Sequence, residues 1–260
     1  MRKQVLLLLA SALTLAGIIT ITSLHSRGQG ASGSKAEVAT PVQQGVMSAQ
    51  QKEHSKLYKD YKGNGKLLNL LNKEENNADN ELIITVMPGL PELSPKGRSS
   101  APEAFLNNLA SSADAVVIGT VTNKSSQLTE NGAFVFTDYD VSVEEVLKDN
   151  GSNSLQSQSS IVVTRPGGRI LLEGRVVTAR DRAFKPFTVG GRYLLFLKYI
   201  PTTDAYHAVN DKGSFELVDN KSVKLLTEAP DAPRIDKDAP SFINDVRTAI
   251  AATKSRPQDG

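Results

Sequence analysis

Hydrophobic and polar residues alternate with a period of two along much of the chain between residues 113 and 218. In the clearest case, Tyr139, Val141 and Val143 share one face of a predicted strand. Asp138 and Asp140 fall on the other face, which is typical of a strand with one side in a core and one in solvent. Strands are predicted over residues 113–121, 133–147, 161–164, 170–179, 192–200, 205–209 and 214–218. Short strands at this spacing predict a small closed barrel or a sandwich.

Two details qualify this pattern. Phe134 and Phe136 have the opposite parity to Tyr139 and Val141, which predicts a bulge or a bend near Thr137. The run 194–197 is apolar on both faces and predicts a central strand.

Helical patterns flank the strands on both sides. The first covers residues 102–112, with Pro102 in its first turn and Glu103 at its positive end. The second covers residues 241–253, with Ser241 as its predicted cap. The predicted fold is therefore mainly β with an N-terminal and a C-terminal helix.

The N-terminus carries a long apolar segment. Arg2 and Lys3 precede an uncharged run from Val5 to Leu24. As a helix this run is about 30 Å long, which matches the thickness of a bilayer core. Residues 1–27 are therefore interpreted as an uncleaved membrane anchor or a cleaved signal peptide, with the cations favouring a cytoplasmic N-terminus. Both interpretations place the rest of the chain outside the cytoplasm, either anchored to the membrane or secreted.

Residues 28–100 do not show the pattern of a compact domain. They begin with a Gly/Ser-rich stretch and continue with a thin apolar stripe, which predicts a flexible tether with weak local structure. Within it, 66–73 is a short helical candidate and 81–87 a candidate strand. The predicted barrel domain spans 101–225, and 226–260 is a C-terminal extension that contains the last helix.

The composition excludes several classes of site. None of the 260 residues is a Cys, which excludes disulfides, thiolate metal sites and Cys nucleophiles. Of the three His, His25 and His54 lie outside the predicted domain and only His207 lies within it. Gly-x-Ser-x-Gly, phosphate-loop and dinucleotide-binding sequences are absent. The sequence therefore predicts no catalytic residue set, no metal site and no cofactor.

Three stretches together resemble a known family. They are Ala113-Asp-Ala-Val-Val-Ile-Gly-Thr-Val121, Tyr139-Asp-Val-Ser-Val-Glu-Glu-Val-Leu-Lys148 and Val189-Gly-Gly-Arg-Tyr-Leu-Leu-Phe-Leu197. In this order, over about residues 101–220, they resemble the netrin-like domain, the OB-type barrel of the tissue inhibitors of metalloproteinases. The resemblance implies a small OB-like antiparallel β-barrel. Those inhibitors chelate zinc through an N-terminal Cys, so the absence of Cys here means that their mechanism does not carry over.

Two groups of charged residues are candidates for chemistry. Asp138, Asp140 and Glu144 share a strand face with alternate residues about 7 Å apart, which suits calcium binding, acid/base catalysis or a solvated surface. The segment 165–198 has a net charge of +6 in a chain of net +2, and aromatic residues are interleaved with its cations. The candidate ligand-binding residues in this segment are Arg165, Arg169, Arg180, Arg182, Lys185, Phe184 and Phe187.

The sequence thus predicts a non-enzymatic extracytoplasmic binding or interaction module. Its expected partners are the membrane, through the N-terminal segment, and a protein or an anionic glycan. No nucleic-acid partner is expected, because of the predicted compartment. The alternative is an extracytoplasmic hydrolase that uses Asp and Glu residues on the barrel surface.

Overall fold

The computed structural model describes residues 42–43, 46–61, 67, 81–86, 102–150, 154–181, 183–210, 212–219, 221–227 and 233–254. All of these residues belong to one compact unit, Thr40–Gly260. The fold is mainly β, with a closed five-stranded barrel and helices against it, which confirms the predicted fold class. None of the helices described is long and apolar enough to cross a membrane, and the run from Val5 to Leu24 lies outside the described residues.

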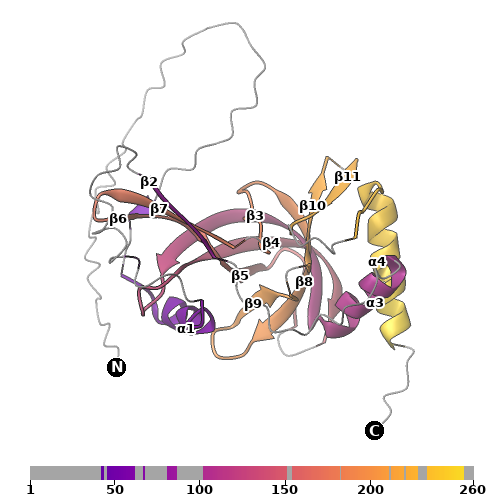
Figure 1. The fold of residues 1–260 in the computed structure, drawn as a ribbon. Coiled ribbons are helices and arrows are strands. Elements are labelled where there is room, and N and C mark those ends of the chain that lie inside the picture. Colours follow the sequence, from indigo (N-terminus) through magenta and orange to yellow (C-terminus); the bar gives the residue numbers. More distant parts are fainter. Residues whose placement is uncertain are drawn as a thin grey trace, which may run out of the picture. The chain divides into compact units, whose positions relative to one another are not determined.

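The barrel has the connectivity of an OB fold (Figure 1). Its strands are β3 (Ala115–Leu128), β4 (Val135–Asp149), β5 (Ser160–Pro166), β8 (Arg192–Ile200) and β9 (Ala205–Ala208). They follow the order β8-β3-β4-β5-β9, and a pairing of β8 with β9 closes the circle. All pairs are antiparallel except β5 with β9, which is parallel. This is a five-stranded barrel with three strands in a meander and a hairpin that returns to close it.

Alternate residues of β4 face the barrel interior and the outer face of the barrel. Tyr139, Val141 and Val143 point into the barrel, where they pack in a buried hydrophobic cluster with residues of the other strands. Phe134 and Phe136 are also buried, but on the outer face. The pairing of β4 with β3 is continuous around Thr137, so the predicted bulge at that position is wrong. The two rings are buried because another part of the chain covers them, as described below.

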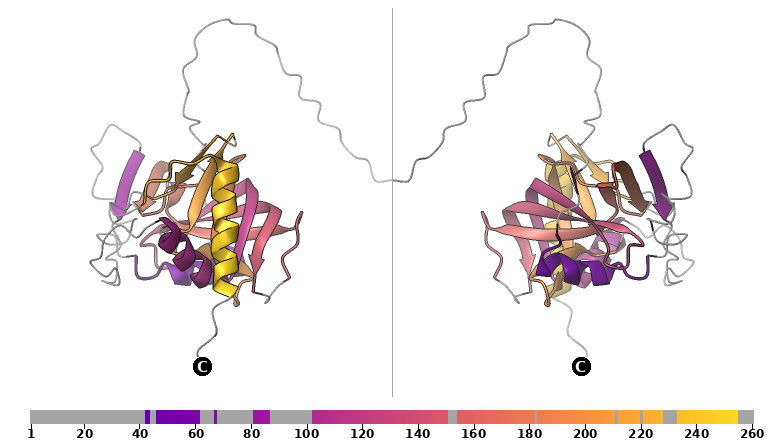
Figure 2. Two further views of the ribbon diagram at one scale, coloured as in Figure 1. Left: turned by 90° about the vertical axis from the view of Figure 1, so that its right-hand side faces the viewer. Right: turned by 90° about the vertical axis from the view of Figure 1, so that its left-hand side faces the viewer.

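Two helices cover one outer side of the barrel (Figure 2). They are α3 (Pro102–Ser112) and α4 (Ala239–Lys254), which pack on β3 and β8 together with β10 (Ser214–Val218) and β11 (Ser222–Leu225). The cap of α4 is Asp238, whose carboxylate accepts hydrogen bonds from the main-chain N–H and the hydroxyl of Ser241. Ser241 therefore lies inside the helix, and its predicted role as the cap is wrong.

The residues that carry the family resemblance have structural roles. Asp114 binds Lys198 Nζ at 2.9 Å and accepts a hydrogen bond from the Tyr199 main chain at 3.0 Å. Gly119 on β3 pairs with Val143 on β4, and a Cβ atom there would come within 2.6 Å of the Ser142 carbonyl oxygen. These contacts tie the barrel strands to one another, so these sequence stretches report on the fold.

Lys148, the last residue of the second motif, anchors α3 to the barrel. Its Nζ atom donates hydrogen bonds to the carbonyl oxygens of Ala110 and Ala113, both at 2.7 Å, and the residue is buried. Carbonyl groups at a helix C-terminus have no partner within the helix, and a cation there satisfies them.

Substitution of Lys148 by Met is therefore expected to lower the free energy of unfolding by about 2 kcal/mol, because the Ala110 carbonyl loses this donor and the Ala113 carbonyl keeps only the longer hydrogen bond from Asn150 Nδ2, at 3.5 Å. Chemical denaturation of the variant measures this loss. Lys221→Met is the matched control, since Lys221 is exposed in the turn between β10 and β11. Equal stability of the two variants would contradict the anchoring role.

The predicted strand 170–179 is in fact a hairpin. It consists of β6 (Gly168–Leu172) and β7 (Arg175–Asp181), joined by a two-residue turn at Glu173 and Gly174. Both turn residues have positive φ angles, 50° and 78°, as a tight hairpin turn of this length requires. Glu-Gly is a weaker turn signal than Asn-Gly, which explains why the pattern suggested one strand.

Part of the predicted tether packs on the domain. β1 (Val42–Gln43) pairs with β6, and β2 (Glu81–Val86) pairs in parallel with β7, which gives a second sheet of four strands. Between them, α1 (Ala49–Leu57) and Leu67 lie against the barrel and the hairpin. The structure thus differs from a domain that begins at residue 101: elements from within 28–100 complete its sheets and cover its outer face.

Candidate functional site

The alternation of β5 places Arg165 inside the barrel. Ile161 and Val163, four and two residues earlier, belong to the hydrophobic cluster of the barrel interior. Arg165 continues the same face, and it is 2% exposed. A guanidinium group therefore occupies a position where the strand pattern predicts an aliphatic side chain.

Aromatic rings surround this guanidinium group. Its Cζ atom lies 4.2 Å from the ring centroid of Phe187 and 5.3 Å from that of Phe184. Phe187 is itself held edge-on against Tyr139 at 4.9 Å and tilted against Tyr193 at 4.7 Å. The faces of the rings attract the cation and replace part of its lost hydration.

The nitrogen atoms of Arg165 have no hydrogen-bond acceptor in the part of the chain that the structure describes; Nε, Nη1 and Nη2 are all buried. Burial lowers the pKa of Arg165 to about 10, although the neighbouring phenol groups and Asp181 oppose this change. The group is still protonated at neutral pH. A buried cation without a hydrogen-bonded anion costs on the order of several kcal/mol, so its presence requires an explanation.

Asp181 is the carboxylate that attracts Arg165 electrostatically. It is buried, and its oxygens accept hydrogen bonds from the Tyr61 hydroxyl at 3.0 Å and from the Ala183 main chain at 2.8 Å. Burial and the nearby carboxylate together raise the pKa of Tyr61 above its usual value. Asp181 thus fixes the start of the segment 183–188, which carries the two phenylalanine rings.

The structure brings together three of the seven candidate residues, Arg165, Phe184 and Phe187. No protein-family model and no curated protein sequence matches the chain. The assignment of a functional site therefore depends on this geometry alone. For Arg165 the prediction of a charged surface is wrong, because its side chain lies in the barrel interior.

The other four candidates do not join this cluster. Arg180, on β7, and Lys185 are exposed, and Arg169, on β6, is half-buried. Arg182 lies outside the described residues.

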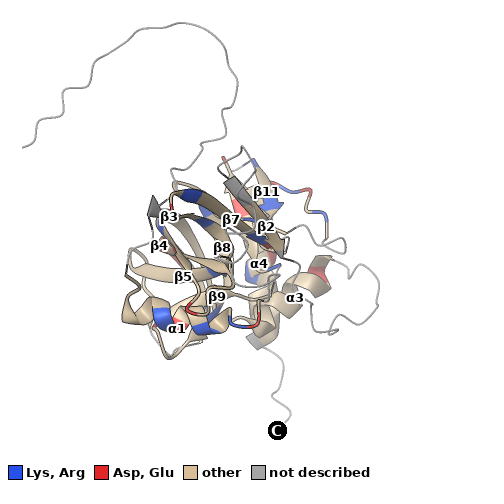
Figure 3. Ribbon diagram, turned by 60° about the vertical axis from the view of Figure 1, so that its left-hand side comes forward, with Lys and Arg blue, Asp and Glu red and all other residues tan. Residues whose placement is uncertain are grey.

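Two more cations of the segment 165–198 are engaged in ion pairs. Arg192 Nε lies 2.7 Å from Glu144, and Lys198 Nζ lies 2.9 Å from Asp114. Figure 3 shows blue positions on β7, which belongs to this segment, and also on α1 and β11, which do not, with red and tan positions between them. The net charge of the segment is thus spread over several elements and is partly neutralised.

The three carboxylates on one face of β4 do not converge on a common point. Asp138 lies beneath α1, and Asp140 accepts a hydrogen bond from Asn123 at 3.1 Å. Partial burial raises the pKa of Glu144, but hydrogen bonds from Thr120 and Arg192 outweigh it and hold the pKa below its usual value. Among the described residues, no three His, Asp or Glu side chains are placed to hold a metal ion.

Asp138 takes part in a contact that the sequence analysis missed. His54 Nδ1 lies 2.9 Å from Asp138 Oδ1, and His54 Nε2 lies 3.0 Å from Thr203 Oγ1. A carboxylate, an imidazole and a hydroxyl in this order resemble a hydrolytic triad. His54 is 0% exposed, however, so no substrate reaches the imidazole in this arrangement. Phe134 and Phe136 could have indicated this contact from the sequence, because aromatic rings on the outer face of a strand need another part of the chain to cover them.

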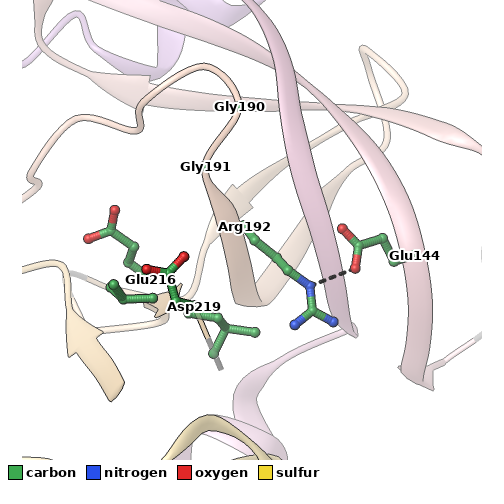
Figure 4. Close-up of a pocket in the computed structure, with 8 residues that line it drawn as sticks. Glu144, Gly190, Gly191, Arg192, Glu216 and Asp219 are labelled. Carbon is green, nitrogen blue, oxygen red and sulfur yellow. Dashed lines mark hydrogen bonds and ion pairs between the residues drawn. The ribbon is translucent and has the colours of Figure 1, made fainter. Parts of the chain in front are cut away.

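A surface groove of about 510 Å³ lies on another side of the barrel (Figure 4). It is lined by Glu144, Gly190, Gly191, Arg192, Glu216, Leu217, Val218 and Asp219. In Figure 4, Arg192 points to Glu144, and both Glu216 and Asp219 lie on the opposite side. The cation of this groove is already bound by a carboxylate, so the groove gives no indication of a particular ligand.

Proposed function

We propose that this chain is a non-enzymatic, extracytoplasmic binding module that holds the carboxylate of an anionic ligand at Arg165. One observation carries the proposal: a protonated guanidinium group, buried between two aromatic rings, has three nitrogen atoms that find no acceptor among the described residues. A carboxylate matches the planar fork of a guanidinium group and forms two parallel hydrogen bonds with it.

Phe184 controls access to Arg165 in this proposal. It is half-buried, whereas Phe187 on the other side is 2% exposed. Residues 185–188 have no regular secondary structure, and main-chain hydrogen bonds from Phe184 to Asp181 and from Lys185 to Leu226 hold this part of the chain. A displacement of the Phe184 ring opens the path from solvent to the guanidinium group.

The ligand class is an anionic glycan that contains a uronic acid. The charged N-terminal pair and the apolar run from Val5 to Leu24 support export to a compartment where such glycans occur. The OB connectivity supports the resemblance to the netrin-like domain, a fold that presents its loops and strand faces to partners. The alternative of a hydrolase is less well supported, because Asp138, Asp140 and Glu144 do not line a common cleft with Arg165.

The test is thermal unfolding of the full-length protein in sodium glucuronate and, separately, in glucose at the same ionic strength. A ligand at about 100 times its Kd stabilises the folded state by about 2.7 kcal/mol, so glucuronate is expected to raise the Tm and glucose is not. Arg165→Met abolishes the rise. Phe184→Ala preserves or increases it, because the path to Arg165 is then open.

Arg180→Met is the matched control, since it removes the same charge from an exposed position. It is expected to leave the response to glucuronate unchanged. An equal loss in Arg165→Met and Arg180→Met, or no response in the parent protein, would refute the proposal and leave Arg165 as a structural residue.

A further inference from the structure

A segment of the chain itself covers the outer face that β4 and β5 form. In barrels of this topology, ligands bind on the second and third strands and on the loops that join strands 1–2 and 4–5. The equivalents here are β4, β5, the β3–β4 loop and the β8–β9 loop. Residues 49–61, which comprise α1 and the turn after it, contact all four.

Polar contacts hold the helical part of this segment. His54 bridges Asp138 on β4 and Thr203 in the β8–β9 loop, at 2.9 Å and 3.0 Å. The Ser55 hydroxyl accepts a hydrogen bond from the main-chain N–H of Glu130, in the β3–β4 loop, at 2.8 Å.

Aromatic contacts hold the part that follows the helix. The Tyr58 ring stacks on Phe136 with 5.6 Å between centroids, and the Tyr61 ring stacks on Phe134 at 4.7 Å. The Tyr58 hydroxyl also donates a hydrogen bond to Thr164 on β5, at 3.2 Å. Without the segment, each phenylalanine ring would lose the tyrosine ring that stacks on it, while Phe134 would remain in the cluster with Ile170 and Val177 of the hairpin.

The residues that α1 buries are those expected of a docked peptide and not those expected of a core helix. Its buried residues are His54 and Ser55, whereas Leu57 is 44% exposed. A core helix buries its aliphatic residues and exposes its polar ones. With only nine residues, α1 is also too short to be stable by itself, so it exists through its contacts with the barrel.

We propose that residues 49–61 are an intramolecular ligand of the β4–β5 face and that a tyrosine-bearing peptide segment of a partner protein binds there in their place. The proposal does not require a ligand at Arg165, which lies on the inner side of β5; the segment is linked to that site through the Tyr61 hydroxyl, which donates a hydrogen bond to Asp181 at 3.0 Å. Local opening of the segment exposes the face while the barrel stays folded, because the segment contributes nothing to the interior cluster.

The chemistry of the face defines the partner. It offers the Asp138 carboxylate, the hydroxyl groups of Ser125, Thr164 and Thr203, and the rings of Phe134 and Phe136. In the hydrogen bonds described between the segment and the barrel, no Lys or Arg side chain of the barrel takes part. The face therefore fits a peptide with imidazole or phenol donors and aromatic rings, and does not fit a polyanion.

The first measurement is native-state hydrogen exchange of the full-length protein. The amides of α1 are expected to exchange through local opening, at least about tenfold faster than the amides of β4 in the barrel interior. If α1 and β4 exchange together, the segment opens only when the barrel unfolds, and the proposal is overturned.

The second measurement uses a reversible lock. The Ser55 hydroxyl lies 2.8 Å from the main-chain N of Glu130, so Ser55→Cys with Glu130→Cys is the pair chosen for a disulfide, and titration of free thiols checks that it forms. The chain has no Cys of its own that could compete. The probe is a labelled synthetic peptide of residues 46–61, and the control peptide carries Ala in place of Tyr58 and Tyr61.

The oxidised lock is expected to bind neither peptide, and reduction is expected to restore the weak binding of the parent protein to the first peptide. Full-length protein with Tyr58→Ala and Tyr61→Ala is expected to bind that peptide at least about tenfold more tightly than the parent, because the competing segment is weakened. Equal binding by the oxidised and the reduced lock would overturn the proposal. So would equal binding of the two peptides.

Discussion

Replacement of Phe187 by Ala is expected to lower the free energy of unfolding by about 3–5 kcal/mol, the largest effect of any single substitution considered for this protein. Phe187 fills the end of the barrel and contacts Tyr139, Tyr193 and Arg165. Its removal leaves a cavity and also takes away the nearer of the two rings that face the guanidinium group. Equilibrium denaturation with urea measures the loss.

Phe184→Ala is the control for this experiment. Phe184 also faces Arg165, but at 5.3 Å, and it is only half-buried. Its replacement is expected to cost less than half as much as that of Phe187. A similar cost for both variants would mean that the two rings enclose Arg165 to the same degree and that Phe184 does not control access.

Deletion of residues 1–98 is expected to destabilise the remaining chain by more than about 5 kcal/mol, which is comparable to the whole stability of many domains. The deletion removes β1, β2 and α1 together with Leu67, which is fully buried. It uncovers Phe134 and Phe136 and leaves Asp138 without His54. Calorimetry of the truncated chain is expected to show a lost or strongly lowered unfolding transition.

A chain that starts at Thr40 is the control, because it retains every described residue. It is expected to unfold at the same temperature as the parent protein. If the chain from residue 99 melted as cooperatively and at the same temperature as the chain from Thr40, the boundary predicted at residue 101 would hold.

The barrel strands were predictable because their side chains obey a simple periodicity. Alternation identified β4, and a run that is apolar on both faces identified β8. The helix that precedes β3 was placed at the residues where the structure has it, Pro102–Ser112. The hairpin of β6 and β7 was missed because its turn, Glu173-Gly174, is a weak signal in sequence. Capping of α4 by Asp238 was missed because Pro240 and Ser241 gave the stronger local pattern.

The candidate site was predictable only in part. Arg165, Phe184 and Phe187 were predicted as site residues because the segment 165–198 is positively charged and rich in aromatic residues. The same pattern predicted that they lie on the surface, whereas Arg165 is enclosed by the two rings. The position of Arg165 depends on the register of β5, since a shift by one residue would turn its side chain to the outer face. Charge counting does not detect register, so burial of the guanidinium group appeared only in three dimensions.

The sequence by itself determined the strand-rich fold, the flanking helices and the absence of cysteine chemistry, because these depend on local periodicity and composition. Only the tertiary structure decided that His54, Tyr58 and Tyr61 belong to the domain. Their segment is mostly polar and its apolar stripe is thin, so nothing local marks it as packed. It is ordered by partners 84 and 149 residues away along the chain, Asp138 and Thr203, and contacts between such distant residues arise only when the barrel has brought its loops together.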